Sequence, residues 1–340
     1  MRVILFEWGK KCERRPWTLV CVNIEVIRKV FLNRCFTVHK KVLSLAMIMA
    51  IVGVSCTGCS KKSDVLKKSN KAETEETEEV TFEDGVVDLD NQKRTMTYAD
   101  GSYIFHNMVV DESAKPMPYD LDNFVNVDGR MTYEGDDYTY RLGVDVSKYQ
   151  DEVKWNKVER DGYDFAMIRL GYRGYTKGEI FLDERYEYNV KAANRSGLDV
   201  GVYFFSQAIS ENEAIEEARF VLEHVKDEDI SMPIVYDPEI VYKDNSRTKN
   251  ITKEQFTKNV ETFCSEIREA GYDVMVYANL LWEDKQLDMG LISYLDIWYA
   301  DYVGLPQTPY DFKMWQYTDS GTVDGIKGGA DINIQLIKKE

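Results

Sequence analysis

From Leu142 onward, short apolar runs alternate with amphipathic segments, and this alternation constrains the fold more than any other feature. The runs have the length and composition of strands buried on both faces. Residues 211–225 repeat apolar side chains at helical spacing, and residues 252–271 start with a capping residue and stop at glycine. Strands alternating with helices predict a parallel sheet, and seven or eight such units predict a closed (β/α) barrel. Helical segments are short or missing in the last third, so we expect an irregular TIM-like barrel. The apolar runs lie at residues 142–146, 165–170, 200–205, 233–236, 274–278, 297–300 and 312–317.

The part of the chain after residue 59 is strongly acidic. Residues 60–340 carry 33 Lys and Arg against 56 Asp and Glu, a net charge of −23. Phosphate binding depends on Lys and Arg, so this balance argues against nucleic acid as a partner. It fits an extracellular protein that its charge keeps soluble, and we expect a monomer.

Histidine and cysteine are too scarce for most metal chemistry. The chain has three histidines, and Cys264 is the one cysteine after residue 59. A zinc site built on histidine is therefore nearly excluded, and so are histidine-dependent triads and metal-dependent deacetylases. We expect no metal and no cofactor, which leaves acidic side chains to carry any catalysis.

The first 59 residues end in a segment typical of export. Lys40 and Lys41 precede an apolar stretch, residues 42–54, that is short for a transmembrane helix. The stretch is followed by a sequence resembling a bacterial lipobox, which makes Cys59 the expected lipidation site, with Cys56 as the alternative. A short uncleaved anchor is the other interpretation, and both place the acidic part outside the cytoplasmic membrane.

The remaining chain divides into three parts. Residues 60–79 have the polar composition of a disordered tether. Residues 80–141 contain a faint repeat, in which 94–103 resembles 130–138, and each copy suggests a β-hairpin. We interpret 80–141 as a small strand-rich module, for structural packing rather than glycan binding, before a catalytic barrel at 142–340.

Two carboxylates follow one predicted strand. Asp237 and Glu239 are two positions apart, so in an extended chain they share a face. Functional residues of (β/α) barrels gather at the carboxyl ends of strands, where paired carboxylates can cleave a glycosidic bond. Aromatic rings in the same places can stack on sugars, while polar groups bind hydroxyls. The candidate acids are Asp145, Asp237, Glu239 and Asp331, and the candidate substrate contacts are Tyr203, Phe205, Tyr277, Trp298, Trp315 and Gln316.

Seven motifs, in order, give residues 142–340 a resemblance to glycoside hydrolase family 25, the Chalaropsis-type lysozymes. They differ from the family pattern in two places. Asp151 stands where Gly or Pro is common, and Pro238 separates the two acids. The motifs are GVDVSKYQ at 143–150, FAMIRLGY at 165–172, GLDVGVYFFS at 197–206, DPE at 237–239, WYADY at 298–302, WQY at 315–317 and GADIN at 329–333.

The resemblance implies β-1,4-N-acetylmuramidase activity on peptidoglycan. It makes Glu239 the general acid/base and Asp237 its partner, with Asp145 and Asp331 tuning the pocket. By analogy we expect retention of configuration with help from the substrate's acetamido group. We expect Arg169 to form a buried ion pair.

Two other functions remain open. The barrel could bind glycan without turnover, although binding alone would not need several costly acids held together. A chitinase-like glycosidase could also use an acid pair on a strand.

Overall fold

The computed structural model describes residues 93–100 and 104–340. The predicted lipidation site Cys59, the tether at 60–79 and the start of the strand-rich module lie outside these residues. Within them, no helix is long and apolar enough to cross a bilayer.

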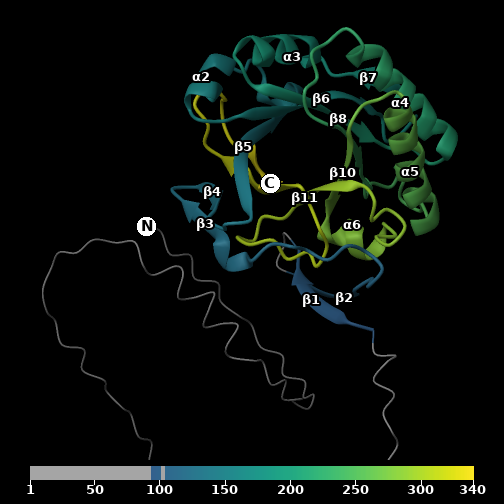
Figure 1. The fold of residues 1–340 in the computed structure, drawn as a ribbon. Coiled ribbons are helices and arrows are strands. Elements are labelled where there is room, and N and C mark those ends of the chain that lie inside the picture. Colours follow the sequence, from purple (N-terminus) through teal and green to yellow (C-terminus); the bar gives the residue numbers. More distant parts are fainter. Residues whose placement is uncertain (1–92, 101–103) are drawn as a thin grey trace, which may run out of the picture. The chain divides into compact units, whose positions relative to one another are not determined.

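Eight strands close into a barrel, seen end-on in Figure 1. The order around the ring is β5, β6, β8, β9, β10, β11, β12 and β13, and β13 pairs back onto β5. Seven strands are parallel, whereas β13 is antiparallel to both of its neighbours. The predicted mixed α/β class and closed barrel are confirmed. The strands are β5 Tyr138–Val146, β6 Phe165–Arg173, β8 Asp199–Ser206, β9 Ile234–Pro238, β10 Val274–Asn279, β11 Asp296–Ala300, β12 Met314–Gly321 and β13 Ala330–Lys338.

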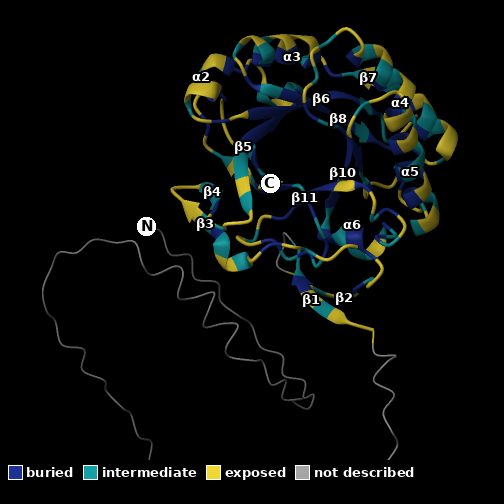
Figure 2. Cartoon of the chain, in the orientation of Figure 1, coloured by how far each residue is buried: buried dark blue, intermediate teal, exposed yellow. Residues whose placement is uncertain are grey.

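Helices cover the outside of the first five parallel strands, and no helix connects β11 to β12 or β12 to β13. The helix-forming signals act where the sequence places them: Ser210 caps α4 and Thr252 caps α5 through their side-chain oxygens. Figure 2 shows the exposed faces of the outer helices against the buried strands. The helices are α2 Trp155–Arg160, α3 Tyr186–Arg195, α4 Glu211–Val225, α5 Lys253–Glu269 and α6 Leu280–Lys285.

The barrel interior is a packed core rather than a pore. Phe165, Met167, Val235, Met275 and further inward-facing side chains form a cluster separate from the larger core between strands and helices. A glycine makes room for one of them: a Cβ at residue 143 would lie 2.2 Å from the Phe165 ring. Alternate residues of each strand therefore face inward, and the site is built above this floor.

Two hairpins precede the barrel and pack against it. The first joins β1 Thr95–Ala99 to β2 Phe105–Val109, and the second joins β3 Phe124–Val127 to β4 Arg130–Tyr133. Buried residues of both, including Tyr98 and Phe124, belong to the barrel's outer core. The second hairpin differs from our expectation for residues 130–138. Its turn lies at residues 128–129, because β4 pairs with the strand before it rather than with the segment after it.

Candidate active site

The strand geometry brings the four predicted acids to one end of the barrel. Asp237 is the last but one residue of β9, where its Cα pairs with that of Phe205 on β8, and Glu239 follows two residues later. Asp145 lies one residue before the end of β5. Because β13 is antiparallel, its amino end lies at this same rim, and the Cα of Asp331 pairs with that of Asp145.

Asp145 is buried and tightly hydrogen-bonded. Its Oδ2 accepts from Gln316 Nε2 at 2.7 Å and from Asn333 Nδ2 at 2.8 Å. Burial raises the pKa of Asp145 to about 6, which these two bonds and a hydrogen bond with Asp331 oppose. Burial and then repulsion from Asp145 raise the pKa of Asp331 to about 8. Since two donors already favour a carboxylate at Asp145, the shared proton belongs on Asp331.

Asp237 and Glu239 form a second interacting pair. Burial, followed by repulsion from Glu239 and Asp145, raises the pKa of Asp237 well above its usual range. Burial raises the pKa of Glu239 to about 7. Arg169 opposes the rise at Asp237, but its guanidinium is committed to Asp183, with Nε 2.8 Å from Oδ2, as the sequence analysis expected. The pair therefore retains a proton near neutral pH, the condition for a general acid beside a second carboxyl group.

The backbone of Glu239 is held where the sheet ladder ends. Pro238, the last residue of β9, has no amide proton to donate, and the ladder ends at its pair with Ser206. Beyond it, Glu239 N–H donates to the Ser206 carbonyl at 3.3 Å, and Gln207 Nε2 donates to the Glu239 carbonyl at 2.7 Å. Thr248 Oγ1 in turn donates to Gln207 Oε1 at 2.9 Å. The buried Gln207 amide thus replaces the missing ladder and positions the acid.

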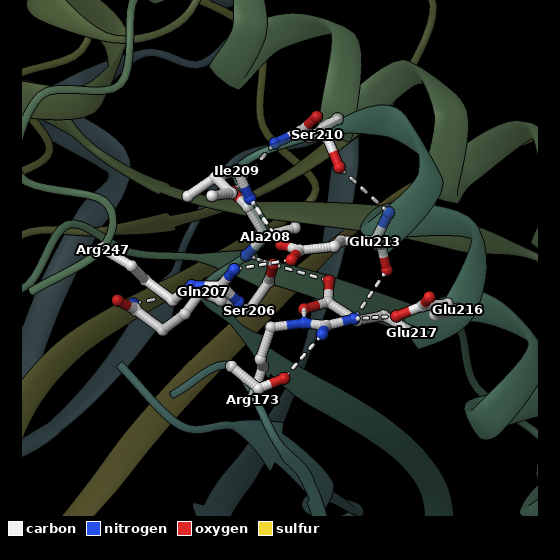
Figure 3. Close-up of polar contacts among 12 residues, drawn as sticks. Arg173, Ser206, Gln207, Ala208, Ile209, Ser210, Glu213, Glu216, Glu217 and Arg247 are labelled. Atoms are coloured by element: carbon white, nitrogen blue, oxygen red, sulfur yellow. Dashed lines mark hydrogen bonds and ion pairs between the residues drawn. The ribbon is translucent and has the colours of Figure 1, made fainter. Parts of the chain in front are cut away.

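Behind the same strand end lies a buried charged cluster, drawn in Figure 3. Arg173 Nε donates to Glu217 Oε1 at 2.7 Å, and its NH2 group reaches Glu216 at 3.1 Å. The other oxygen of Glu217 accepts from the hydroxyls of Ser206 at 2.7 Å and Tyr236 at 3.2 Å. Burial raises the pKa of Glu217 to about 7 even beside Arg173. The Glu217 carboxylate is buried and cannot reach a substrate. The cluster therefore supports the end of the strand.

Tyr203 and Tyr277 pack against Trp298 in the barrel interior. Both rings meet the Trp298 ring edge-on, with centroids 5.9 and 5.1 Å away. Trp298 Nε1 donates to Asn333 Oδ1 at 2.8 Å, and Tyr277 O–H donates to Gln316 Oε1 at 2.9 Å. The side chains that hold Asp145 are thus themselves oriented by the aromatic residues.

Trp315, a predicted sugar contact, lies outside the barrel interior. Strand alternation points Gln316 into the barrel and Trp315 out of it, where Trp315 is completely buried. Its Nε1 donates to the Asp301 carbonyl at 2.9 Å, and its ring meets that of Phe124 edge-on. Trp298 is inside the barrel but only 1% exposed, so it supports the site rather than covering a substrate.

Two polar residues of the site escaped the sequence analysis. Asn333 follows Asp331 at the spacing that puts both on one face, so period-two alternation could have identified it. Gln207 comes directly after a strand, but nothing local shows that its amide reaches the Glu239 carbonyl across two strands.

Three exposed tyrosines that were not among the predicted substrate contacts follow strands at this end. Tyr149 follows β5, Tyr242 follows β9 and Tyr302 follows β11, and all three are exposed. Tyr302 also donates from its hydroxyl to Gln316 Oε1 at 2.6 Å. In the described part of the chain, no group of three His, Cys, Asp or Glu is arranged to hold a metal ion.

Comparison with known proteins agrees with this geometry. The model of the family "Glycosyl hydrolases family 25" matches residues 144–326. An autolytic lysozyme of Clostridium acetobutylicum is 27% identical over 192 residues, covering 56% of this chain and 54% of that protein. Lysozyme M1 of Streptomyces globisporus is 24% identical over 200 residues, covering 56% of this chain and 66% of that protein. The chain thus spans little more than half the length of the first of these relatives.

The fold also resembles that of a solved structure. The modular autolysin LytC from Streptococcus pneumoniae, in complex with a synthetic peptidoglycan ligand, superposes with a TM-score of 0.54 at 23% identity. The match covers 72% of this chain and 56% of LytC. At this identity the likeness concerns the fold alone.

Proposed function

This chain belongs to glycosyl hydrolase family 25, and on that premise we propose that it is a peptidoglycan hydrolase. The bond cleaved is the β-1,4 linkage between N-acetylmuramic acid and N-acetylglucosamine. The observation that carries the proposal is the pair Asp237 and Glu239 at the barrel rim, where both pKa values are raised. Paired carboxyl groups of this kind are what acid-catalysed cleavage of a glycosidic bond requires.

Glu239 is the general acid and base in this proposal. It is half-buried, and its pKa of about 7 leaves it protonated in mildly acidic solution. It protonates the leaving oxygen as the glycosidic bond breaks. It then takes a proton from the incoming water, as microscopic reversibility demands.

Asp237 stabilises the positive charge that develops at the sugar. Its Oδ1 is buried and has no hydrogen-bond partner among the described residues, so a substrate N–H can supply one. An acetamido N–H held there would direct the acetamido carbonyl oxygen at the anomeric carbon. This arrangement favours retention of configuration with assistance from the substrate.

Asp145 and Asp331 control the charge around this pair. The carboxylate of Asp145 is fixed by Gln316 and Asn333, while Asp331 carries the proton that they share. The fixed charge of Asp145 contributes to the raised pKa of Asp237. The rim thereby avoids four adjacent negative charges, which burial would make very costly.

The pH dependence of the reaction follows from Glu239. Its protonated form does the work of the acid, and burial places its pKa at about 7. We expect kcat/KM to be highest in mildly acidic solution and to fall about tenfold for each pH unit well above 7. Initial rates on soluble glycan fragments between pH 4 and pH 9 measure this profile. A rate that stays constant from pH 6 to pH 9 would contradict the assignment.

Identification of new reducing ends tests the proposed function. Purified peptidoglycan is digested with the protein, reduced with borohydride and analysed by mass spectrometry. Reduced muramic acid supports the proposal. Reduced glucosamine or release of chitin oligomers points instead to a chitinase-like glycosidase, and tight binding without release points to a glycan-binding barrel. Proton NMR of the first product distinguishes retention from inversion.

The proposal also covers the class of barrel, the division of the chain and its attachment to the membrane. Seven parallel strands with external helices support the interpretation of an irregular TIM-like barrel, in which the antiparallel β13 would replace a last β/α unit. Residues 142–340 form the catalytic part, and residues 80–141 form the strand-rich module. Lipidation at Cys59 and the tether at 60–79 would hold the protein, as a monomer, on the outer side of the cytoplasmic membrane within reach of the wall.

A further inference from the structure

Tyr149 is exposed at the rim, next to the proposed active site. It lies in the short 3-10 helix η3, Lys148–Gln150, which follows β5 directly, four residues after Asp145. Its side chain is 77% exposed, the highest value among the large hydrophobic residues of the described chain. A large aromatic ring that is exposed at the functional end of a barrel is a candidate for contact with a ligand.

The ring is held in place on one face. The Arg169 guanidinium lies 5.2 Å from the centroid of Tyr149 and 5.3 Å from that of Tyr172. Arg169 is fixed in turn by Asp183, which is itself buried, with Nε 2.8 Å from Oδ2. A cation over one face of the ring leaves the opposite face to solvent and limits rotation of the side chain.

The backbone that carries the ring is also fixed. Ser147 and Gln150 form a reciprocal capping box around η3, and the Lys148 N–H donates to Asp183 Oδ2 at 3.1 Å. Asp151 ends the turn at φ +53°, a region that favours glycine, and its carboxylate pairs with Arg185. Asp183 therefore anchors both the turn and the guanidinium beneath the ring.

The same guanidinium lies close to the acids. Arg169 follows Ile168, whose Cα pairs with that of Val146 at the end of β5, so it lies at the rim that carries Asp145. We propose that the free face of Tyr149 is a stacking platform for an N-acetylhexosamine ring of the glycan, on the Asp145 side of the site. The inference rests on the proposed function and assigns it a subsite. A ring already ordered loses little conformational entropy when a pyranose stacks on it.

The chain contains a matched residue at the other end of the barrel. Tyr294 is 49% exposed, and its ring lies 5.4 Å from the Arg268 guanidinium. It precedes β11, so it belongs to the amino ends of the parallel strands, away from the acids. The two tyrosines share their chemistry and differ in location, which makes Tyr294 the control for Tyr149.

The experiment measures binding and turnover separately. Binding of chitohexaose, a β-1,4-linked N-acetylglucosamine oligomer, is measured by calorimetry in the full chain carrying Glu239→Gln, so that no turnover is needed. To this background are added Tyr149→Ala, Tyr149→Trp or Tyr294→Ala. The same three changes in the active protein are assayed for kcat and KM on soluble peptidoglycan fragments.

We expect Tyr149→Ala to raise Kd and KM about three- to tenfold, the usual scale of an aromatic contact, with kcat within about twofold. Tyr149→Trp should keep the affinity, and Tyr294→Ala should change nothing. Thermal unfolding of Tyr149→Ala should stay within about 2 °C of the parent, because an exposed side chain is lost.

Two results would overturn the inference: unchanged Kd and KM in Tyr149→Ala, or an equal loss of affinity in Tyr294→Ala. Its failure is distinguishable from failure of the proposed function. If the protein releases reduced muramic acid but Tyr149→Ala changes neither Kd nor KM, the proposed function holds and the subsite does not. If the protein releases no reducing ends and Tyr149→Ala still weakens chitohexaose binding, the subsite holds and the proposed activity does not.

Discussion

Replacing Glu239 by Gln is expected to lower the rate of glycan hydrolysis about 10²–10⁴-fold, the usual contribution of a general acid. The amide has nearly the same shape but cannot deliver a proton to the leaving oxygen. The fold should be unaffected, because the contacts that place residue 239, from Ser206 and Gln207, involve its backbone. Release of reducing ends from purified peptidoglycan measures the rate, and circular dichroism verifies the fold.

A second buried acid provides the control. Glu283 is buried and accepts from Thr308 Oγ1 at 2.6 Å, and burial raises its pKa to about 8. It lies on α6, outside the acids of the rim. Glu283→Gln should retain activity within about twofold, because it removes a buried carboxyl group with a raised pKa that lies outside the proposed catalytic residues. Comparable losses in both variants would mean that Glu239 matters only for structure.

Replacing Arg173 by Met is expected to lower the free energy of unfolding by about 3–5 kcal/mol. The change leaves Glu217, which has no solvent exposure, without its cation. The hydroxyls of Ser206 and Tyr236 remain but cannot neutralise a charge. Urea denaturation followed by tryptophan fluorescence measures the loss, which is large relative to the stability of an ordinary domain.

The loss should depend on pH. The pKa of Glu217 is already raised to about 7 in the folded protein, and removing Arg173 raises it further. Folded protein then holds a proton that unfolded protein releases at lower pH, so stability falls as pH rises through this interval. Arg173→Met should therefore be less harmful at pH 5, where Glu217 can be neutral, than at pH 8.

Two further variants separate the buried charge from general effects of substitution. Arg173→Met combined with Glu217→Leu should recover most of the stability, because replacing both members of a buried pair by apolar residues is often neutral. Lys157→Met breaks an exposed pair with Asp324, 2.9 Å long, and should cost less than about 1 kcal/mol. A full loss that persists in the double variant would show that packing, not charge, is responsible.

Local sequence patterns sufficed for the elements of the barrel. Each of the seven predicted apolar runs overlaps a strand, and the predicted helix at 211–225 coincides with α4. Such features depend on a few consecutive side chains, through burial on both faces or the helical repeat. The eighth strand, β13, was not among the predicted runs because it begins among glycines and polar residues. It also pairs antiparallel with both of its neighbours, β12 and the distant β5, which the pattern of alternating strands and helices does not predict.

The aromatic residues show where local patterns were insufficient. Trp315 and Gln316 are neighbours in β12, and both are buried. Which of the two side chains points into the barrel is decided only by how the faces of β12 are oriented in the closed ring. The strand that is buried on both faces carries no polar alternation to indicate this direction. Tyr149, which is open to solvent, looked in the sequence like one residue of a motif.

The sequence by itself determined the alternating architecture, the acidic pair Asp237 and Glu239 and the family, because each is encoded in neighbouring residues or in their order along the chain. Tertiary structure alone decided the antiparallel course of β13 that brings Asp331 to Asp145, the Gln207 contact that holds Glu239, and the face of each strand that meets the substrate. These features depend on which strands become neighbours when the barrel closes. Ring closure is a property of the whole sheet, and no short segment of the chain specifies it.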